Sequence, residues 1–481
     1  MQDKNVRNRG AVSVYLALML TVMIPLIFTM MEGVRINAVK TASECAVELS
    51  LNAVLAEYDR ELLKQYDLLF INTAYDSKTG DMKNITDHLK HYVNENLDTG
   101  NDMLKLSLED IECTAAARAT DEDGAVFRYM ALSYMLEKYG IAYAQDAFDM
   151  IKSSESSKLF TGNIEKEEAE AQKKLDDYKF EVPQVDDGNG GKMDDPDWEE
   201  PEKADPASKV NSGKKKGILK LSCEGELSKE AVDTGVYASH RDLVKGDGMC
   251  SDWDKREGLI YDCLFNEYIM EKTGDYRNEK EGSVLKYETE YVIAGRSADS
   301  DNLKAVAEKI LLLRGASNTL YYATDKELTG AASTMAATLS AATGTAVLEP
   351  LYKTLISAAW IYAESVSDVK EIMNGGKVPL LKKKSDWKLS MENALAFKFD
   401  GLSETEDKGL DYEDHLRIFL YTLKEKERTG RMIDIVEMNI RASTENENFR
   451  MDDCIAAAAF TFKFRSAYGY DVMTSRTARY M

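Results

Sequence analysis

The sequence predicts an α+β fold with a majority of helices, in which an N-terminal transmembrane helix continues into a long stem helix and then a mixed ectodomain. An uncharged run from Ala11 to Met31 predicts the transmembrane helix, and alanines at helical spacing after it predict the stem. Beyond the stem, segments with helical periodicity outnumber segments with strand alternation. The two kinds do not alternate regularly, which argues against a sheet built from βαβ units.

The composition is that of a folded and strongly acidic protein. A chain of 481 residues is longer than one compact core usually accommodates, and 44% hydrophobic residues are typical of folded chains. The 84 acidic and 61 basic residues give a formal net charge of −23. Such a surface repels phosphate groups, so we expect no nucleic-acid partner and no broad attraction to anionic lipids or wall polymers.

Residues 1–10 form a basic leader and residues 11–31 the transmembrane segment. The apolar run is longer than that of most signal peptides, and no small-residue cleavage site follows it, so we expect a retained anchor. Positive residues before the run favour a cytoplasmic N-terminus; they are Lys4, Arg7 and Arg9. The sequence therefore predicts a single-pass cell-membrane protein that contacts the lipid bilayer and has its bulk outside the cytoplasm.

Residues 32–64 predict a helical stem. Small and apolar residues recur there at spacings of three and four, which is the pattern of a seam that packs against another helix. The seam consists of Ala38, Ala42, Ala46, Leu49 and Ala53. Two interpretations are open: the stem packs on the ectodomain of its own chain, or it packs on neighbouring subunits.

Residues 65–162 predict a first α+β part of the ectodomain. Apolar residues alternate within 104–108 and again, in a second register, from Ile111 onward, which predicts a strand with a bulge. The segment 124–151 that follows is typical of a helix. Helical and strand elements are thus expected side by side directly after the stem.

Residues 163–217 predict a charged helix, followed by a linker or exposed loop rich in acidic residues, proline and glycine. Residues 218–481 predict a second, mostly helical part of the ectodomain. Its best strand candidate is 282–295, and a buried strand is expected at 454–464. The helices expected there span 301–313, 329–343, 346–373 and 411–426.

No motif in the chain predicts a catalytic, cofactor-binding or metal site, and we expect a non-catalytic protein. The six dispersed cysteines include no C-x-x-C pair, and unpaired core cysteines are favoured over disulfides. His88 and His91 share a helical face but have no third metal ligand in the sequence. The acidic cluster 120–124 departs from the twelve-residue calcium loop. His415 is expected at an exposed helix start.

Ser385 and Lys388 form the S-x-x-K pattern of serine acyl enzymes, in which the lysine would activate the serine. The K-T-G triplet that accompanies this pattern is absent, and the segment also fits a basic turn around a buried Trp387. The competing functional hypothesis is an anchored enzyme or ligand sensor. It requires convergent polar groups, such as His240 with several acids.

The N-terminus resembles the pseudopilins of the tight-adherence (Tad/Flp) pilus system. Gly10 ends a short basic leader, an apolar helix follows from Ala11, and Glu32 and Arg35 stand before the alanine-rich continuation. Later segments are similar to an uncharacterised family of large bacterial membrane-anchored proteins associated with such systems. These segments span 55–71, 291–314, 358–383 and 416–423.

The resemblance implies cleavage between Gly10 and Ala11. The fifth mature residue would then be Tyr15, where the family favours a glutamate that pairs with a neighbouring subunit's N-terminal amine. Without this carboxylate we expect a minor or accessory component of the pilus or secretion apparatus. Its expected partners are other membrane or pilus-system proteins, with the stem helix as the contact of any oligomer, and no cofactor is expected.

Overall fold

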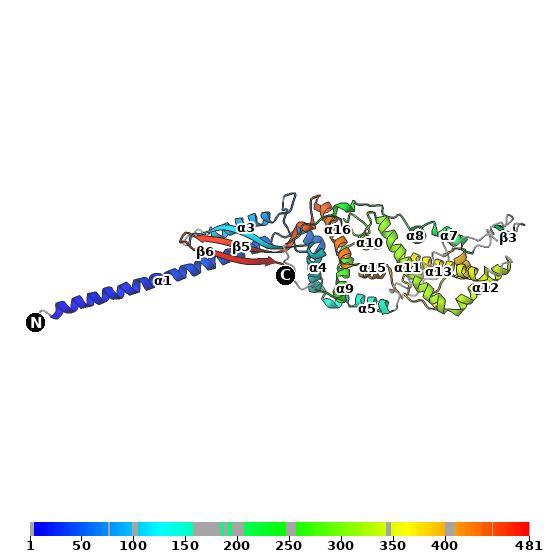
Figure 1. Cartoon of the computed structure of the whole chain (residues 1–481), viewed down its shortest axis with the longest axis horizontal. Coiled ribbons are helices and arrows are strands. Elements are labelled where there is room, and N and C mark those ends of the chain that lie inside the picture. The colour runs from blue at the N-terminus through cyan, green and yellow to red at the C-terminus, as the bar shows by residue number, and fades with distance from the viewer. Residues whose placement is uncertain are drawn as a thin grey trace. The chain divides into compact units, whose positions relative to one another are not determined.

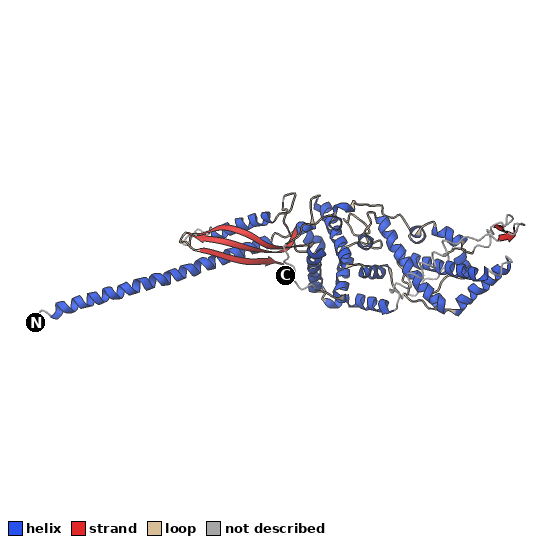
Figure 2. Cartoon of the chain, in the orientation of Figure 1, coloured by secondary structure: helices blue, strands red, loops and turns tan. Residues whose placement is uncertain are grey.

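The computed structural model describes residues 4–75, 77–98, 104–156, 184–186, 191–194, 206–246, 256–342, 348–399, 409–444 and 446–480. The chain divides into two compact units. The sheet unit contains residues 1–134, 241–255 and 436–481, and the helical unit contains residues 135–240 and 256–435. Helices predominate over a small sheet among the described residues (Figure 2), so the predicted α+β class with a helical majority is confirmed.

A single long helix, α1, opens the sheet unit and spans Lys4–Leu55 (Figure 1). All side chains from Val12 to Met31 are exposed, and the helix is long and apolar enough to cross a membrane. The helix ends at Leu55, earlier than the expected end near residue 64. A separate helix then starts after Asp59, whose carboxylate accepts hydrogen bonds from the backbone N–H groups of Glu61 and Leu62.

The second half of α1 lies on one face of an antiparallel sheet. The strands are β1 (Ile71–Asn72), β2 (Leu106–Arg118), β5 (Cys454–Ser466) and β6 (Asp471–Arg479), and β5 pairs with each of the other three. The helices α2 (Arg60–Tyr66) and α3 (Met82–Leu97) complete this part of the unit. The predicted strands at 104–115 and 454–464 are thereby confirmed, while β6 was not predicted.

The core of the sheet unit lies between the sheet and two helices. Phe460, Phe462 and Phe464 alternate along β5 and point to one face, as residues two apart in a strand must. On that face they meet Val47 of α1 and Leu89 of α3. The β2–β5 register shifts three times, first between Leu108 and Asp110, which confirms the predicted bulge.

Three short segments close the sheet unit. The chain passes through α4 (Asp121–Lys138), the first part of which belongs to this unit, and returns through the end of α16 (Glu425–Thr444). The 3-10 turn η7 (Met451–Asp453) then leads into β5. The N-terminal and C-terminal segments therefore build one unit, and the predicted boundary after residue 217 falls inside the other unit.

The helical unit is built around two long helices that lie side by side, α11 (Asp299–Thr324) and α13 (Glu349–Met373). The helix α12 (Lys326–Ala342) packs on α13, and Trp360 is central to the apolar cluster that they share. The remaining elements are α5 (Gln145–Ser156), α7 (Ser208–Lys214), α8 (Ile218–Ser222), α9 (Leu259–Lys272), α10 (Glu288–Ala294), α14 (Met391–Leu395), α15 (Tyr412–Thr422), the turns η1 (Ile141–Ala144), η2 (Thr234–Val236), η3 (Ala238–His240) and η6 (Lys384–Asp386), and the hairpin β3 (Gln184–Asp186) with β4 (Lys192–Asp194).

The strand predicted at 282–295 is wrong, because this segment forms the helix α10. Every residue from Glu288 to Ile293 is buried, and the helix ends at Gly295 with a φ of 64°. A short segment enclosed on all sides has no exposed face to mark its period, so alternation does not separate strand from helix there. Bonds from the loop 273–278 to the side chains of Glu288 and Glu290 hold this helix instead.

The other helical expectations agree with the structure, apart from breaks within them. The segment 124–151 breaks at Gly140, which has a φ of 73°, and 411–426 is interrupted between α15 and α16. The helices expected at 301–313, 329–343 and 346–373 are present as α11, α12 and α13. The helix expected at 163–181 lies outside the described residues, as do residues 182–183, 187–190 and 195–205 of the linker that follows it.

We predict that an aspartate at Val47 destabilises the sheet unit, whereas an aspartate at Leu49 does not. Val47 is 0% exposed on the sheet side of α1, and Leu49 is 57% exposed. An unpaired carboxylate buried at Val47 should lower the free energy of unfolding by about 3 kcal/mol or more. Amide hydrogen exchange of β5 in the two variants measures the effect, and equal protection in both would contradict this packing.

Candidate functional site

The residues of the predicted processing site lie in the apolar half of α1. Gly10 and Ala11 are in the helix, but their side chains lie outside the described residues. Tyr15 is 66% exposed in the same helical stretch as Val12 and Leu16. Its phenol therefore stands among the apolar side chains that would face lipid.

The alanine seam only partly coincides with the face of α1 that packs on the sheet. Ala46 is 3% exposed, whereas Leu49 is 57% exposed, and Ala38, Ala42 and Ala53 are half-buried. The buried face passes instead through Val39, Ser43, Val47, Leu51 and Val54. At 3.6 residues per turn its centre is rotated by roughly 120° from that of the seam. The second half of α1 thus packs on the sheet of its own chain and leaves part of the seam uncovered.

His88 and His91, the possible metal ligands in the sequence, make other contacts. His88 Nδ1 lies 3.0 Å from Glu57 Oε1, and the hydroxyl of Tyr92 donates to the same carboxylate oxygen at 2.7 Å. His91 lies 3.5 Å from Glu95 at the surface. Throughout the described part of the chain, no three histidine, cysteine, aspartate or glutamate side chains are grouped as metal ligands.

The expectation that His415 is exposed is wrong. It stands at the start of α15 as predicted, but its side chain is 0% exposed, and Nδ1 lies 2.6 Å from the carbonyl oxygen of Asp411. Burial lowers the pKa of His415 to about 4, so the ring is neutral at neutral pH. A neutral Nδ1–H donates to the carbonyl, and His415 acts as a helix-start contact in the interior.

The acid beside His240 also has structural partners. His240 is exposed at the end of η3, directly after Ser239. The Asp434 carboxylate accepts hydrogen bonds from the backbone N–H of Ser239 at 2.8 Å and from the hydroxyl of Tyr291 at 2.9 Å. These bonds join η3, α10 and α16, so the group is a tertiary contact of the helical unit.

The acidic cluster 120–124 organises a loop of the sheet unit. Asp121 accepts hydrogen bonds from the backbone N–H groups of Arg118 and Gly246, each at 2.8 Å. The next three residues have positive φ angles of 50°, 59° and 91°, a conformation that costs energy at non-glycine residues. Asp121 thus fixes a sharp turn between β2 and the main body of α4.

The S-x-x-K pattern is not assembled as a nucleophile and base. Ser385 donates to Asp386 at 3.0 Å, while the ammonium group of Lys388 contacts the carboxylate of Glu371. Trp387, expected to be buried, is half-buried. Lys388 therefore belongs to a different constellation, which sequence reasoning missed.

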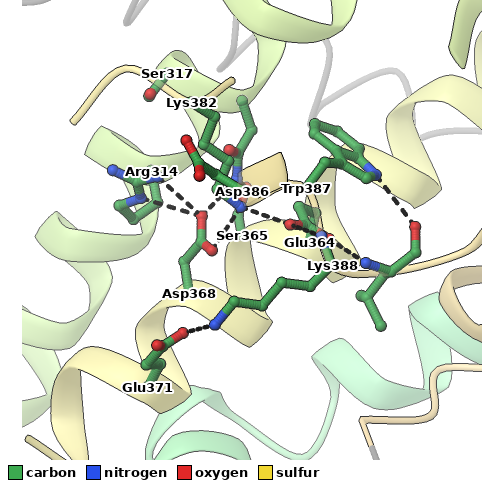
Figure 3. Close-up of polar contacts among 12 residues, drawn as sticks. Arg314, Ser317, Glu364, Ser365, Asp368, Glu371, Lys382, Asp386, Trp387 and Lys388 are labelled. Atoms are coloured by element: carbon green, nitrogen blue, oxygen red, sulfur yellow. Dashed lines mark hydrogen bonds and ion pairs between the residues drawn. The ribbon is translucent and has the colours of Figure 1, made fainter. Parts of the chain in front are cut away.

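That constellation is a buried ion network in the helical unit, formed by Arg314, Glu364, Asp368, Glu371, Lys382 and Lys388 (Figure 3). Three positive and three negative side chains meet there. The side chains of Arg314, Glu364, Asp368 and Lys382 are 0% exposed. Their charges balance, which is the condition under which charged groups can remain inside a protein.

Lys382 and Asp368 are the centre of the network. The Lys382 ammonium lies 2.5 Å from Glu364 Oε1 and 2.6 Å from Asp368 Oδ1. The guanidinium of Arg314 donates to Asp368 Oδ2 through Nε at 3.1 Å. Burial alone would raise the pKa of Asp368, but Lys382 and Arg314 hold it below its usual value. Asp368 is therefore an ionised carboxylate in the interior.

Several bonds of the network attach one loop, residues 379–389, to the long helices. Arg314 Nη1 donates to the carbonyl oxygen of Pro379 at 2.8 Å. Glu364 accepts hydrogen bonds from the backbone N–H groups of Lys388 and Leu389, each at 2.9 Å. The loop has little regular structure of its own, and these bonds satisfy its buried backbone groups. The network therefore clamps the loop onto α11 and α13.

A second buried group lies between α10, α15 and the loop 273–278. Glu290 is 0% exposed, and its Oε1 accepts from the hydroxyl of Tyr412 at 2.5 Å and from the backbone N–H of Tyr276 at 2.9 Å. Burial, reinforced by the negative charge of Asp275, raises the pKa of Glu290 to about 8. Glu290 is therefore largely protonated at neutral pH, unlike Asp368.

The five cysteines that the structure describes are Cys45, Cys113, Cys223, Cys263 and Cys454, and all are free thiols. Cys263 and Cys454 are buried, while Cys45 is exposed on α1. Burial raises the pKa of the Cys263 thiol to about 11, so it is a neutral core side chain. Cys250 lies outside the described residues.

We predict that Lys382→Met destabilises the helical unit and that Lys384→Met does not. Removing the Lys382 ammonium leaves excess buried negative charge, which should lower the free energy of unfolding by about 3–5 kcal/mol. Lys384 pairs with Glu327 at the surface, where both side chains are more than 70% exposed, so its loss should have little effect. Denaturant unfolding followed by tryptophan fluorescence measures both, since Trp360 and Trp387 lie beside the network.

We also predict that Glu290→Gln makes the helical unit more stable at alkaline pH. The folded state holds the Glu290 proton up to about pH 8, whereas an ordinary glutamate releases it near 4.5. The wild type therefore loses stability as the pH rises from 4.5 through 8, by roughly 4–5 kcal/mol in full, and the glutamine variant does not. Unfolding of both proteins at pH 6 and pH 9 tests this, with the exposed Glu392→Gln as control. Parallel pH profiles for wild type and Glu290→Gln would contradict it.

Comparison with known proteins identifies a family without a described activity. No curated protein and no solved structure matches the chain. A model of a family of unknown function, DUF5702, matches residues 196–466. The matched region includes the buried ion network, Glu290 and strand β5, and it begins after α1. Because the match covers more than half of the 481 residues, the chain belongs to the DUF5702 family of unknown function.

Proposed function

We propose that this chain is a non-catalytic, single-pass membrane protein with an extracytoplasmic bulk, and that it serves as a minor or accessory component of a Tad-like pilus or secretion apparatus. The observation that carries the proposal is the division of α1 into two halves. Val12–Met31 is apolar and exposed, whereas the second half packs on the sheet through Val39, Val47 and Val54. One helix thus serves as both anchor and structural element.

The leader supplies the orientation. Lys4, Arg7 and Arg9 precede the apolar run, and positive charges are retained on the cytoplasmic side. The sheet unit and helical unit then lie on the opposite side. The resemblance of Gly10, Ala11, Glu32 and Arg35 to a pseudopilin N-terminus points to a pilus system, and Tyr15 in place of the paired glutamate favours an accessory role.

A non-catalytic role fits the contacts of the charged side chains. The ions of the buried network are paired with one another and attach the loop 379–389. Asp434 and Glu290 are likewise bonded to neighbouring hydroxyl and backbone groups. Each of these groups makes a tertiary contact within the protein. The only ligands that the proposal requires are partner proteins.

The uncovered part of the seam is where a partner helix would contact the stem. We predict that Leu49→Cys, in a Cys45→Ser background, forms crosslinks to pilus-system membrane proteins in intact cells. Val47→Cys is the matched control, because Val47 is 0% exposed and faces the sheet. Mass spectrometry of the adducts identifies the partner. Adducts at neither position, or equal adducts at both, would contradict a specific helix contact.

N-terminal mass spectrometry of the membrane-extracted protein tests the anchor itself. A mature start at Ala11 is expected if a prepilin-type peptidase acts despite Tyr15, and an intact Met1 is expected of a plain signal anchor. Either result keeps the apolar half of α1 in the protein. A start beyond Met31, or recovery of the protein in the soluble fraction, would overturn membrane anchoring.

A further inference from the structure

The turn between β5 and β6 forms a braced tip at one end of the sheet. We use the name hairpin tip for residues 466–470 together with Leu104 and Lys105. Ser466 Oγ donates to the carbonyl oxygen of Leu104 at 2.9 Å, and the backbone N–H of Ala467 donates to that of Lys105 at 3.0 Å. Gly469, with a φ of 84°, allows the tight turn. The start of β2 and the β5–β6 turn are thus one rigid edge.

The hairpin tip lies against α1 at the point where the helix leaves the sheet (Figure 1). The guanidinium carbon of Arg35 is 4.3 Å from the centroid of the Tyr468 ring, a cation–π contact. Nη1 of the same guanidinium also pairs with Glu32 Oε2 at 2.8 Å. The Glu32 and Arg35 pair, singled out from the sequence, therefore fixes the tip on the helix.

This contact sets the depth of the tip relative to the apolar half of α1. The run from Ala11 to Met31 is about 30 Å long at 1.5 Å per residue, which equals the hydrocarbon thickness of a bilayer. Arg35 follows Met31 by four residues, or about 6 Å. The headgroup layer extends about 5–8 Å beyond the hydrocarbon on each side. Arg35, and with it Tyr468, falls within that layer.

We infer that the hairpin tip rests in the phospholipid headgroup layer of the membrane that α1 spans, with Tyr468 and Lys105 as its lipid contacts. Tyrosine favours this layer because its ring is apolar and its hydroxyl is polar. Tyr468 is 43% exposed, and Lys105 is exposed on the same edge. The head is then held at the membrane by two contacts, the helix and the tip, which restricts its rotation and tilt.

The charge of the tip agrees with this contact, although the whole chain carries −23. Arg465 at the base of the turn is paired with Asp471 and Glu109, each at 2.9 Å. Arg35 is paired with Glu32, and Lys105 adds one positive charge. These three positive and three negative charges cancel, so the edge is close to neutral. The repulsion that the acidic surface would exert on anionic lipids is absent from this edge, and zwitterionic headgroups are sufficient partners.

The inference rests on the proposed anchoring by α1, so the experiment measures the two separately. The full chain, with Cys45→Ser, is labelled with a fluorophore at one of three introduced cysteines and reconstituted in phosphatidylcholine vesicles. Leu20→Cys reports on the anchor and Ala467→Cys on the tip. Thr477→Cys, exposed on β6 and about 20 Å along the strand from Asp471, is the matched control. Lipids with a nitroxide near the headgroup are the quencher.

The expected result is severalfold stronger quenching at Ala467→Cys than at Thr477→Cys. A second outcome is quenching at Leu20→Cys by deeper nitroxides with equally weak quenching at the other two sites. This outcome would overturn the tip contact but not the anchor. No quenching at Leu20→Cys would overturn the anchor itself. A label at Ala467→Cys that is shielded from aqueous iodide but not quenched by lipid would indicate a protein partner and would also overturn the proposal.

A second pair of variants tests the role of Tyr468. In the Ala467→Cys protein, Tyr468→Ala should reduce lipid quenching severalfold, and Tyr468→Trp should preserve it. Met473→Ala, which removes an apolar side chain that is 68% exposed on β6, should leave quenching unchanged. Iodide quenching in detergent shows whether the tip keeps its structure. Unchanged lipid quenching in Tyr468→Ala would exclude Tyr468 as the contact.

Discussion

The packing of α1 against the phenylalanine face of β5 is the interaction on which the sheet unit depends. The second half of α1 has an apolar face, and the sheet carries Phe460, Phe462 and Phe464 on one of its faces. When the two apolar faces pack together, each shields the other from water. Because β5 lies near the C-terminus and pairs with three other strands, this unit forms only when both ends of the chain meet. A helix with an exposed apolar first half is thereby joined to the sheet by an apolar core instead of a flexible linker.

The helical unit depends on a different kind of interaction. Fully burying four charged side chains is costly, and the network between α11, α13 and the loop 379–389 contributes mainly by excluding other arrangements of that loop. Glu290 avoids the free-energy cost of a buried charge in another way. Burial raises its pKa, so its carboxyl group stays protonated and neutral. Both groups make the interior sensitive to the loss of one partner. Neither the ion network nor Glu290 is exposed enough to bind a solute from the protein surface.

In the proposed role, the sheet unit is firmly attached to the helix that anchors it. The anchor half of α1 fixes the position of the chain, and the packed half transmits it to the sheet without a hinge. The contact of Arg35 with Tyr468 adds a second point of attachment close to the membrane. The exposed part of the alanine seam at Leu49 remains accessible to a partner helix, so anchoring and assembly use different faces of one helix.

The sequence alone predicted the long apolar helix at the N-terminus, the helical majority, the bulged strand β2 and the buried strand β5. These features are encoded locally, by the length of an uncharged run, by periodicity or by alternation. It also indicated the Glu32 and Arg35 pair, although not its contact with Tyr468. The sequence did not indicate the structural partners of His88 and Lys388, which are Glu57 and Glu371.

Sequence patterns could not predict which face of α1 is buried or that 282–295 contains a helix. They also could not predict that His415 and the ion network lie in the protein interior. The alanine seam and the buried face are both apolar at helical spacing, so sequence spacing could not choose between them. The segment around Glu288 and Glu290 is buried on all sides, so its sequence has no hydrophobic periodicity that would separate a helix from a strand. Arg314, Asp368 and Lys382 come from three separate segments, and charged residues are ordinarily assigned to the surface. Their mutual pairing, which overcomes the free-energy penalty of burial, exists only once these segments meet.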